Sequence, residues 1–216
     1  MNRIVLGVIA VAAMGCTPPG SATGSAFTVS AQDRAGTAHF PRTLRETTLR
    51  CGVFGVGGGQ RDMRDSSDWY GRHLRAAGEA PLFQSAGSSL RFTWLRTFDA
   101  PVIIRLDTAA DGAVTMTATE LSGRGGYEPG AVARRIERRL TAGEAAALAR
   151  MLEQSRVLEQ TAVTCDLGLD GAGWVVESVG ADGYRFIERH SPQDGPVRTF
   201  GLYLIGLTGW TYDKVY

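Results

Sequence analysis

Three side chains of this sequence, His73, Arg96 and Glu177, belong to residue types that can bind or transform a ligand. Imidazole and carboxylate groups act as general acids and bases, and a guanidinium holds anions through paired hydrogen bonds. The three residues are far apart in the sequence, so only the fold can bring them into one site. A pocket that joined them would indicate a small hydrolase, whereas separate positions would indicate a packed histidine and ion pairs between strands.

The sequence contains no complete signature of a familiar catalytic, metal or cofactor site. Its three histidines, His39, His73 and His190, do not have the spacing of paired zinc ligands. The glycine-rich run at residues 55–59 lacks the Lys-Ser/Thr ending of a phosphate-binding loop, and residues 166–171 depart from the calcium-loop spacing. The sequence therefore predicts no metal and no cofactor, and it favours binding over catalysis.

Hydrophobic periodicity predicts the elements that must position these residues. Strands are expected at 90–96, 102–108, 114–121, 132–140, 174–179 and 184–189, where apolar and polar residues alternate or β-branched residues gather. Helices are expected at about 66–77, at 142–154 behind a capping box, and from residue 196 onward. Short links between strands favour an antiparallel sheet. We therefore predict an α+β fold with about six antiparallel strands and two to three helices.

Strand alternation assigns side chains to the faces of this sheet. Trp94 shares a face with two apolar neighbours and Trp174 begins an apolar strand, so both tryptophans are expected in the core. Thr115, Thr117 and Thr119 line a polar face of their strand. That face is interpreted either as an open surface that holds an anion or a glycan, or as a solvated face with ion pairs worth about 0–1 kcal/mol each.

The beginning of the chain has the pattern of a secretion signal. A positive charge at residue 3 precedes an uncharged run over residues 4–15. That run is too short to span a bilayer as a helix, which needs about 20 apolar residues. A cleaved signal peptide over residues 1–15 is therefore predicted.

Residues 13–16, Ala-Met-Gly-Cys, resemble the lipobox of bacterial lipoproteins. The resemblance implies that Cys16 receives the lipid, and Thr17 in place of Asp favours the outer membrane. The chain is then expected in the bacterial cell envelope, facing the periplasm. Residues 13 and 14 differ from the usual lipobox, so cleavage without lipidation and plain secretion is the alternative.

After processing, Cys51 and Cys165 are the two remaining cysteines. An even number of cysteines in an oxidising compartment predicts a disulfide between them. The chain-entropy model assigns a closed loop of about 100 residues a stabilisation of about 4–5 kcal/mol. A reactive thiol is the alternative, and neither cysteine has a histidine beside it in the sequence.

Composition divides the chain into three parts. Residues 1–15 are the predicted signal peptide, residues 16–45 a flexible tether that begins with a run rich in Pro, Gly, Ser and Thr, and residues 46–216 a single α+β domain. An apolar fraction of 44% is sufficient for a core. The formal net charge of +1 argues against a nucleic-acid binder.

Two segments resemble a group of small secreted proteins of Gram-negative bacteria. The first is the strand Trp94-Leu95-Arg96 with the turn at Pro101, and the second runs from Asp170 through Trp174 to Glu177. The likeness covers residues 65–208 and implies no activity. We therefore expect a non-enzymatic binding domain whose partner is an envelope protein or a glycan. A small periplasmic hydrolase and an immunity or inhibitor protein against a secreted enzyme are the alternatives.

Overall fold

The computed structural model describes residues 25–51, 59–166, 168 and 170–216. In chain order the elements are β1 (Ala26–Phe27), α1 (Ala31–Ala35), α2 (Arg42–Arg45), β2 (Thr48–Arg50), β3 (Gln60–Asp62), α3 (Met63–Ala76), the short 3₁₀ helix η1 (Leu82–Gln84), β4 (Ser88–Arg96), β5 (Val102–Thr108), β6 (Val114–Leu121), β7 (Val132–Arg139), α4 (Ala142–Ser155), the short 3₁₀ helix η2 (Val157–Glu159), β8 (Ala172–Gly180), β9 (Gly183–His190) and α5 (Gly195–Thr208).

The described strands form one large antiparallel sheet and one small one. The large sheet has seven strands in the order β1-β9-β8-β4-β5-β6-β7, and β2 pairs with β3. The predicted α+β fold with an antiparallel sheet is therefore confirmed. The additional strand, β1, pairs with the edge of β9 and lies in the segment that the sequence assigned to the tether.

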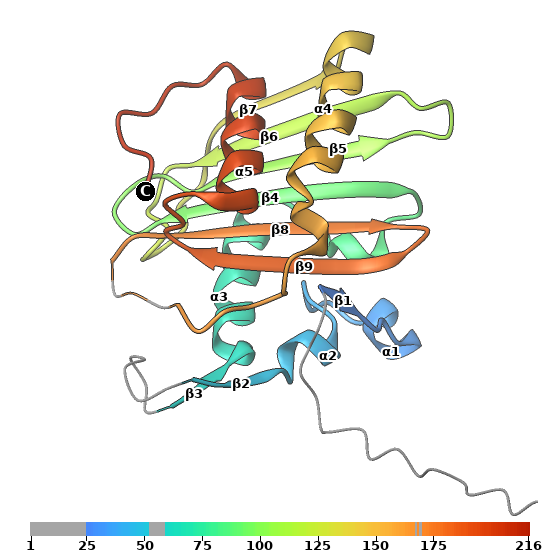
Figure 1. Ribbon diagram of the computed structural model, residues 1–216. Helices are drawn as coiled ribbons and strands as arrows, with labels where there is room; N and C mark the ends of the chain where they lie inside the picture. The colour runs from blue at the N-terminus through green and yellow to red at the C-terminus, as the bar shows by residue number, and fades with distance from the viewer. Residues whose placement is uncertain (1–24, 52–58, 167, 169) are drawn as a thin grey trace, which may run out of the picture.

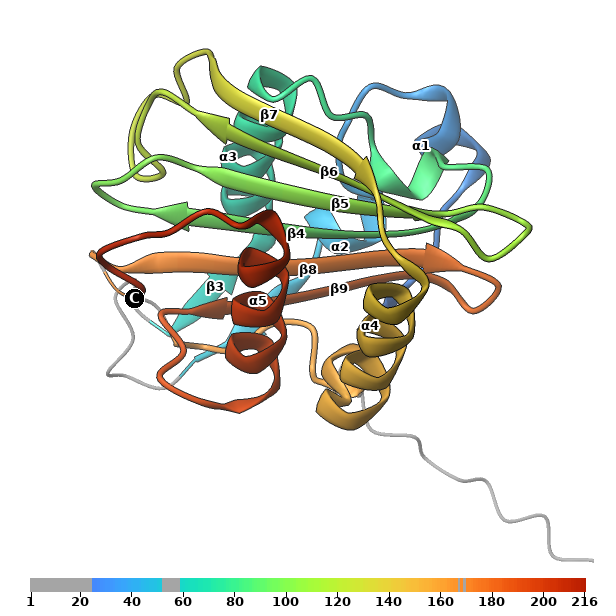
Figure 2. The ribbon, with the colours of Figure 1, turned by 90° about the horizontal axis from the view of Figure 1, so that it is seen from above.

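Both faces of the large sheet are covered. The helices α4 and α5 lie on one face, and α3 lies on the other face together with the N-terminal segment (Figures 1 and 2). The core is accordingly divided by the sheet into two apolar clusters. Trp94 and Trp174, both 0% exposed, belong to the cluster beneath α5, so their predicted core positions are confirmed.

Aromatic packing joins α5 to the centre of the sheet. Trp94 and Trp174 are directly paired in register on β4 and β8, and their ring centroids lie 5.5 Å apart. A Cβ atom at Gly201 of α5 would lie 2.6 Å from the Trp174 ring. Because glycine has no side chain, α5 approaches the tryptophan pair closely and the apolar helix is buried against the sheet.

The segment predicted as a tether, residues 16–45, overlaps the folded part of the chain. Ser25 begins the described chain and is fully buried, and its main-chain oxygen accepts a hydrogen bond from Phe186 of β9. Phe40 and Leu44 are 1% and 0% exposed in the cluster beneath α3. The prediction of a tether over residues 16–45 is thus wrong for residues 25–45, because isolated apolar residues in a polar segment fill the core.

The polar face of β6 is not solvated. Thr117 and Thr119 are 2% and 0% exposed, although their strand has the expected alternation. Their face packs beneath the α3 layer, where Ile103, the partner of Thr119 on β5, belongs to the apolar cluster. Both interpretations of that face, as an open ligand surface or a solvated face, are therefore wrong for these two residues.

Helix boundaries follow local capping. The helix α3 begins at Met63, earlier than predicted, because the Asp62 side chain accepts a hydrogen bond from the Arg64 main-chain nitrogen. The capping box of Thr141 and Glu144 opens α4 as predicted. No helix in the described residues combines the length and apolarity that crossing a membrane requires. The predicted signal peptide and Cys16 lie outside the described residues.

The cap of α4 should make stability depend on acid. Arg138 donates to both Glu144 carboxylate oxygens at 2.9 and 2.7 Å, and these bonds, with those from Thr141, lower the pKa of Glu144 to about 2. A carboxylate with a depressed folded-state pKa stabilises the fold above its unfolded pKa and loses that effect as pH falls. Glu144→Gln should therefore flatten the decline in stability between pH 4.5 and about 2, measured by urea unfolding across that range. An unchanged pH profile would contradict the assignment.

Candidate functional site

Three hollows surround one end of the large sheet, where β4 and β9 end and β8 begins. This end lies beside the C-terminus in Figure 1. We name the hollows the Arg61 pocket, of about 260 Å³, the β9 pocket, of about 390 Å³, and the Arg96 pocket, of about 500 Å³. His190, the last residue of β9, lines both the Arg61 pocket and the β9 pocket.

The floor of the Arg61 pocket is a buried network of Arg61, Tyr70 and Glu188. The Arg61 Nη2 atom donates to Glu188 Oε2 at 2.5 Å, and the Tyr70 hydroxyl donates to Glu188 Oε1 at 3.0 Å. The Arg61 and Glu188 side chains are only 3% and 2% exposed. Burial and the neighbouring Glu188 carboxylate raise the pKa of Tyr70 well above its usual value, so its hydroxyl remains a donor.

Three distant segments position this floor. Glu188 comes from β9, Tyr70 from α3 and Arg61 from the β2–β3 hairpin. The Arg61 Nη1 atom also donates to the main-chain oxygen of Thr164, the residue before Cys165. The floor therefore depends on the hairpin and the segment before Cys165 staying together.

The predicted disulfide between Cys51 and Cys165 joins those same two segments. Their Cα atoms lie 5.5 Å apart and their sequence separation is 114 residues, so the disulfide prediction is confirmed. Replacing both cysteines with alanine should lower the free energy of unfolding by about 2–5 kcal/mol. Urea unfolding measures this loss, and reduced wild-type protein should match the double variant. A double variant as stable as the oxidised protein would contradict the expectation.

The walls of the Arg61 pocket combine apolar and small residues. Trp69 lines one side, where its Nε1 atom donates to the main-chain oxygen of Gly125 at 3.1 Å. A Cβ atom at Gly126 would lie 2.7 Å from the Thr97 side chain, so glycine lets this loop approach the end of β4. A Cβ atom at Gly173 would lie 3.3 Å from the Tyr70 hydroxyl oxygen. These glycines leave the space above the floor open.

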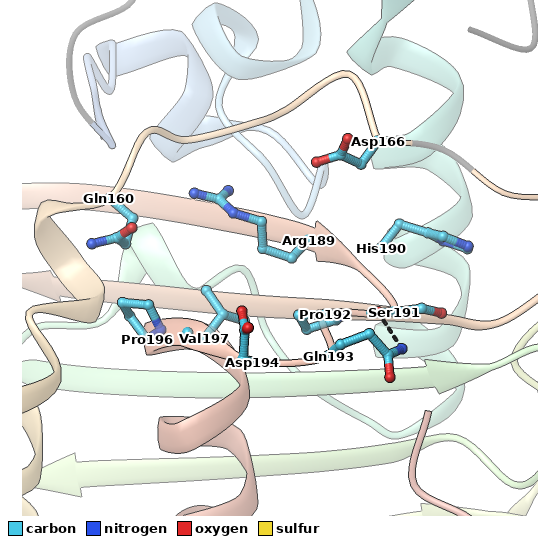
Figure 3. A pocket seen from close by; sticks show the side chains of 11 residues that line it. Gln160, Asp166, Arg189, His190, Ser191, Pro192, Gln193, Asp194, Pro196 and Val197 are labelled. Atoms are coloured by element: carbon cyan, nitrogen blue, oxygen red, sulfur yellow. Dashed lines mark hydrogen bonds between the residues drawn. The ribbon is translucent and has the colours of Figure 1, made fainter. Parts of the chain in front are cut away.

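The β9 pocket lies where β9 turns into α5 (Figure 3). Arg189 donates to the main-chain oxygens of Thr161 at 3.0 Å and Glu188 at 2.7 Å. Burial lowers the pKa of Arg189. In the following turn, Ser191 has a φ angle of 43° and its side-chain oxygen accepts a hydrogen bond from Ala172. These contacts hold the turn and the segment beside β9, which is a structural role.

Glu177, one of the three predicted ligand-contacting residues, is fully buried in an ion pair. The Arg91 Nε and Nη2 atoms donate to its two carboxylate oxygens at 2.8 and 2.9 Å, and the Tyr184 hydroxyl donates at 2.8 Å. Arg91 and Glu177 face each other in register on β4 and β8. Glu177 therefore forms an ion pair between strands, which is the interpretation that the sequence analysis set against a joined pocket.

His73, the second predicted residue, lies on α3 and packs against the loop before β7. It is 0% exposed, and its Nδ1 and Nε2 atoms lie 3.1 and 3.5 Å from the main-chain oxygens of Trp69 and Arg124. Burial lowers the pKa of His73, which favours the neutral ring. His73 lines none of the three hollows described above.

Arg96, the third predicted residue, does line a hollow, the Arg96 pocket. Its guanidinium carbon lies 4.2 Å from the centroid of the Trp94 ring and 4.6 Å from that of Tyr212. Its Nη2 atom donates to the main-chain oxygen of Ala100 at 3.0 Å. Arg96 thus fastens the C-terminal segment to β4, and the described pockets do not join it with His73 and Glu177.

Sequence reasoning did not find the Arg61 pocket. The sequence patterns indicated no chemical role for Arg61, which lies beside a glycine-rich run, or for Tyr70 in the predicted helix. The available signal was the predicted disulfide, because Arg61 follows Cys51 by ten residues and Thr164 precedes Cys165. In the part of the chain that the structure describes, no cluster of three or more His, Cys, Asp or Glu side chains is placed to hold a metal ion.

Comparison with known proteins adds no family. The sequence matches no protein-family model and no curated protein. The geometry of the pockets is therefore the basis on which a ligand site is assigned.

Proposed function

We propose that this chain is a cell-envelope lipoprotein, anchored through Cys16 in the outer membrane and facing the periplasm, with a non-enzymatic binding domain. The ligand binds in the Arg61 pocket. The observation that carries this proposal is the buried network of Arg61, Glu188 and Tyr70 beneath an open hollow. A buried ion pair is seldom more stabilising than apolar packing, so its position under a pocket favours a role in recognition.

The arrangement of the floor supports binding over catalysis. Both carboxylate oxygens of Glu188 already accept hydrogen bonds, one from Arg61 and one from Tyr70. A general base needs a carboxylate or imidazole free to take a proton from the substrate. The floor is instead a fixed set of donors and acceptors, and preorganised polar groups lower the entropic cost of binding.

Labelling with radioactive palmitate tests the anchor. The wild-type chain, expressed with residues 1–24 intact in a Gram-negative host, should incorporate label and fractionate with the outer membrane. Cys16→Ser should lose the label. A wild-type chain without label would contradict the anchor and leave a soluble secreted protein.

Amide signals of the pocket glycines test the ligand site. Fragments of peptidoglycan and oligosaccharide released from lipopolysaccharide are titrated separately into ¹⁵N-labelled protein. A ligand in the Arg61 pocket should shift the amide signals of Gly125, Gly126 and Gly173. The amides of Gly143 in α4 and Gly206 in α5, which lie outside the pocket, are the controls. If neither source shifts the pocket glycines, the assignment of the site is wrong.

An exposed aromatic pair supports a second function, that of an immunity or inhibitor protein. Phe98 and Tyr127 are 49% and 53% exposed, and their ring centroids lie 6.3 Å apart. They extend from two loops at the sheet end that carries the three hollows. Exposed aromatic residues often anchor protein interfaces. The test measures the activity of a secreted lysozyme alone, with the wild-type protein and with the Phe98→Ser/Tyr127→Ser variant. An inhibitor should lower the activity as wild type and lose that effect as the double variant.

A further inference from the structure

We propose that the ligand of the Arg61 pocket is an uncharged, hydroxyl-bearing ring, that is, one neutral hexopyranose unit of an envelope glycan. This inference rests on the proposed function, because it specifies the ligand of the same site. It is derived from the charge, the hydrogen-bonding groups and the size of the pocket.

The charge of the pocket favours a neutral ligand. Arg61 and Glu188 form an ion pair and cancel each other, and Tyr70 keeps its proton. Among the described residues that line the pocket, His190 is the only further titratable side chain, and its Nε2 atom donates to the main-chain oxygen of Asp170 at 3.0 Å. A charged ligand would lose its hydration without gaining a counter-charge.

The hydrogen-bonding groups of the pocket favour hydroxyls. The floor places a guanidinium, which donates, beside two acceptors, the Glu188 carboxylate and the Tyr70 hydroxyl oxygen, whose one hydrogen is donated to Glu188. Ser66 and Thr97 add hydroxyl groups at the walls. A hydroxyl donates one hydrogen bond and accepts up to two, so the neighbouring hydroxyls of a ring match a surface that offers both donors and acceptors.

The size and the walls of the pocket favour a single ring. Its volume of about 260 Å³ is below the range of pockets for drug-sized ligands, which begins at about 300 Å³. Leu95 and the Trp69 side chain form apolar walls. A pyranose ring has apolar C–H groups together with hydroxyls at its edge, and both parts find suitable neighbours here.

A matched series of ligands tests the charge preference. Methyl glucopyranoside, methyl glucuronide and methyl glucosaminide have the same ring with no charge, a negative charge and a positive charge. We expect the neutral ring to shift the amide signals of Gly125, Gly126 and Gly173. Each charged ring should bind at least about tenfold more weakly than the neutral ring. A charged ring that binds as tightly as the neutral one would overturn the inference.

Two glycine variants test the location. Gly173→Ala adds a methyl group toward the Tyr70 hydroxyl, where the Cβ would lie 3.3 Å from the oxygen, and should abolish binding of methyl glucopyranoside while the protein stays folded. Gly206→Ala makes the same change in α5, where the Cβ meets nothing within 4 Å, and should bind like wild type. Unchanged binding by a folded Gly173→Ala variant would overturn the location.

The outcomes separate this inference from the proposed function. Envelope oligosaccharides that shift the pocket glycines, while all three single rings fail to do so, would overturn the neutral hexopyranose and leave the binding site in place. If no envelope component shifts them, both the site and the inference are wrong.

Tyr70→Phe removes one hydroxyl from the floor and should weaken binding of the neutral ring severalfold without unfolding the protein.

Discussion

Glu177→Ala is expected to lower the free energy of unfolding by about 3–5 kcal/mol, because the buried Arg91 guanidinium loses the carboxylate that accepts two of its hydrogen bonds. The Arg91 and Glu177 side chains are both 0% exposed. Burial by itself lowers the pKa of Arg91, and the carboxylates of Glu177 and of Glu79, which lies 3.5 Å from the Arg91 Nη1 atom, more than offset this, so the pKa of Arg91 is raised. Removing the Glu177 carboxylate therefore removes the two hydrogen bonds and the nearer of the two negative charges that stabilise the buried guanidinium.

Urea unfolding of three variants measures this effect. Glu159→Ala, in the exposed pair of Arg156 and Glu159, is the control and should leave the free energy of unfolding nearly unchanged, because solvent screens an exposed ion pair. Replacing both partners with apolar residues, as in Arg91→Met/Glu177→Leu, should recover much of the loss seen in Glu177→Ala. A Glu177→Ala variant as stable as the Glu159→Ala control would contradict the importance of the pair.

The second large effect is expected for Trp174→Ala, which should cost about 3–5 kcal/mol of stability. Trp174 is fully buried, its ring lies against Phe92 and Trp94, and its Nε1 atom donates to the main-chain oxygen of Tyr216 at 3.0 Å. The substitution therefore leaves a cavity and removes one of the two tryptophan hydrogen bonds to the Tyr216 main-chain oxygen, the other coming from Trp94 at 3.3 Å. Trp94→Ala should cost about as much, since its burial and contacts are similar.

Thermal and urea unfolding of the two tryptophan variants measure these losses of stability. Trp210→Ala, at a half-buried position, is the control and should destabilise the protein less than either core variant. Unchanged stability of Trp174→Ala together with lost glycan binding would instead assign Trp174 to a recognition site.

Much of the fold was predictable from the sequence because its signals are local. Alternation in β4, the apolar run in β8 and the capping box before α4 depend on neighbouring residues and need no tertiary information. The disulfide between Cys51 and Cys165 was predictable because only two cysteines remained to pair. The two core tryptophans followed from their apolar neighbours.

The errors came from features that depend on the second layer of the structure. The burial of Phe40 and Leu44 could not be read from a polar segment, because composition averages conceal isolated apolar residues. Alternation in β6 identified a polar face but not that the α3 layer covers it. The Arg61 pocket was not predictable, since β3, α3 and β9 supply its floor from positions up to 127 residues apart.

The strand order leaves the large sheet with two edges that are protected in different ways. At the β9 edge, Ser25 and Ala162 accept hydrogen bonds from main-chain nitrogens of the strand, so that its outer side is already paired. At the opposite edge, β7 has no neighbour on its outer side in the described chain, but it contains four arginines at positions 134, 135, 138 and 139. Charged side chains on an open strand discourage pairing with another molecule. Two copies meeting along this edge would bring two strands rich in charged side chains together, which opposes aggregation by strand addition.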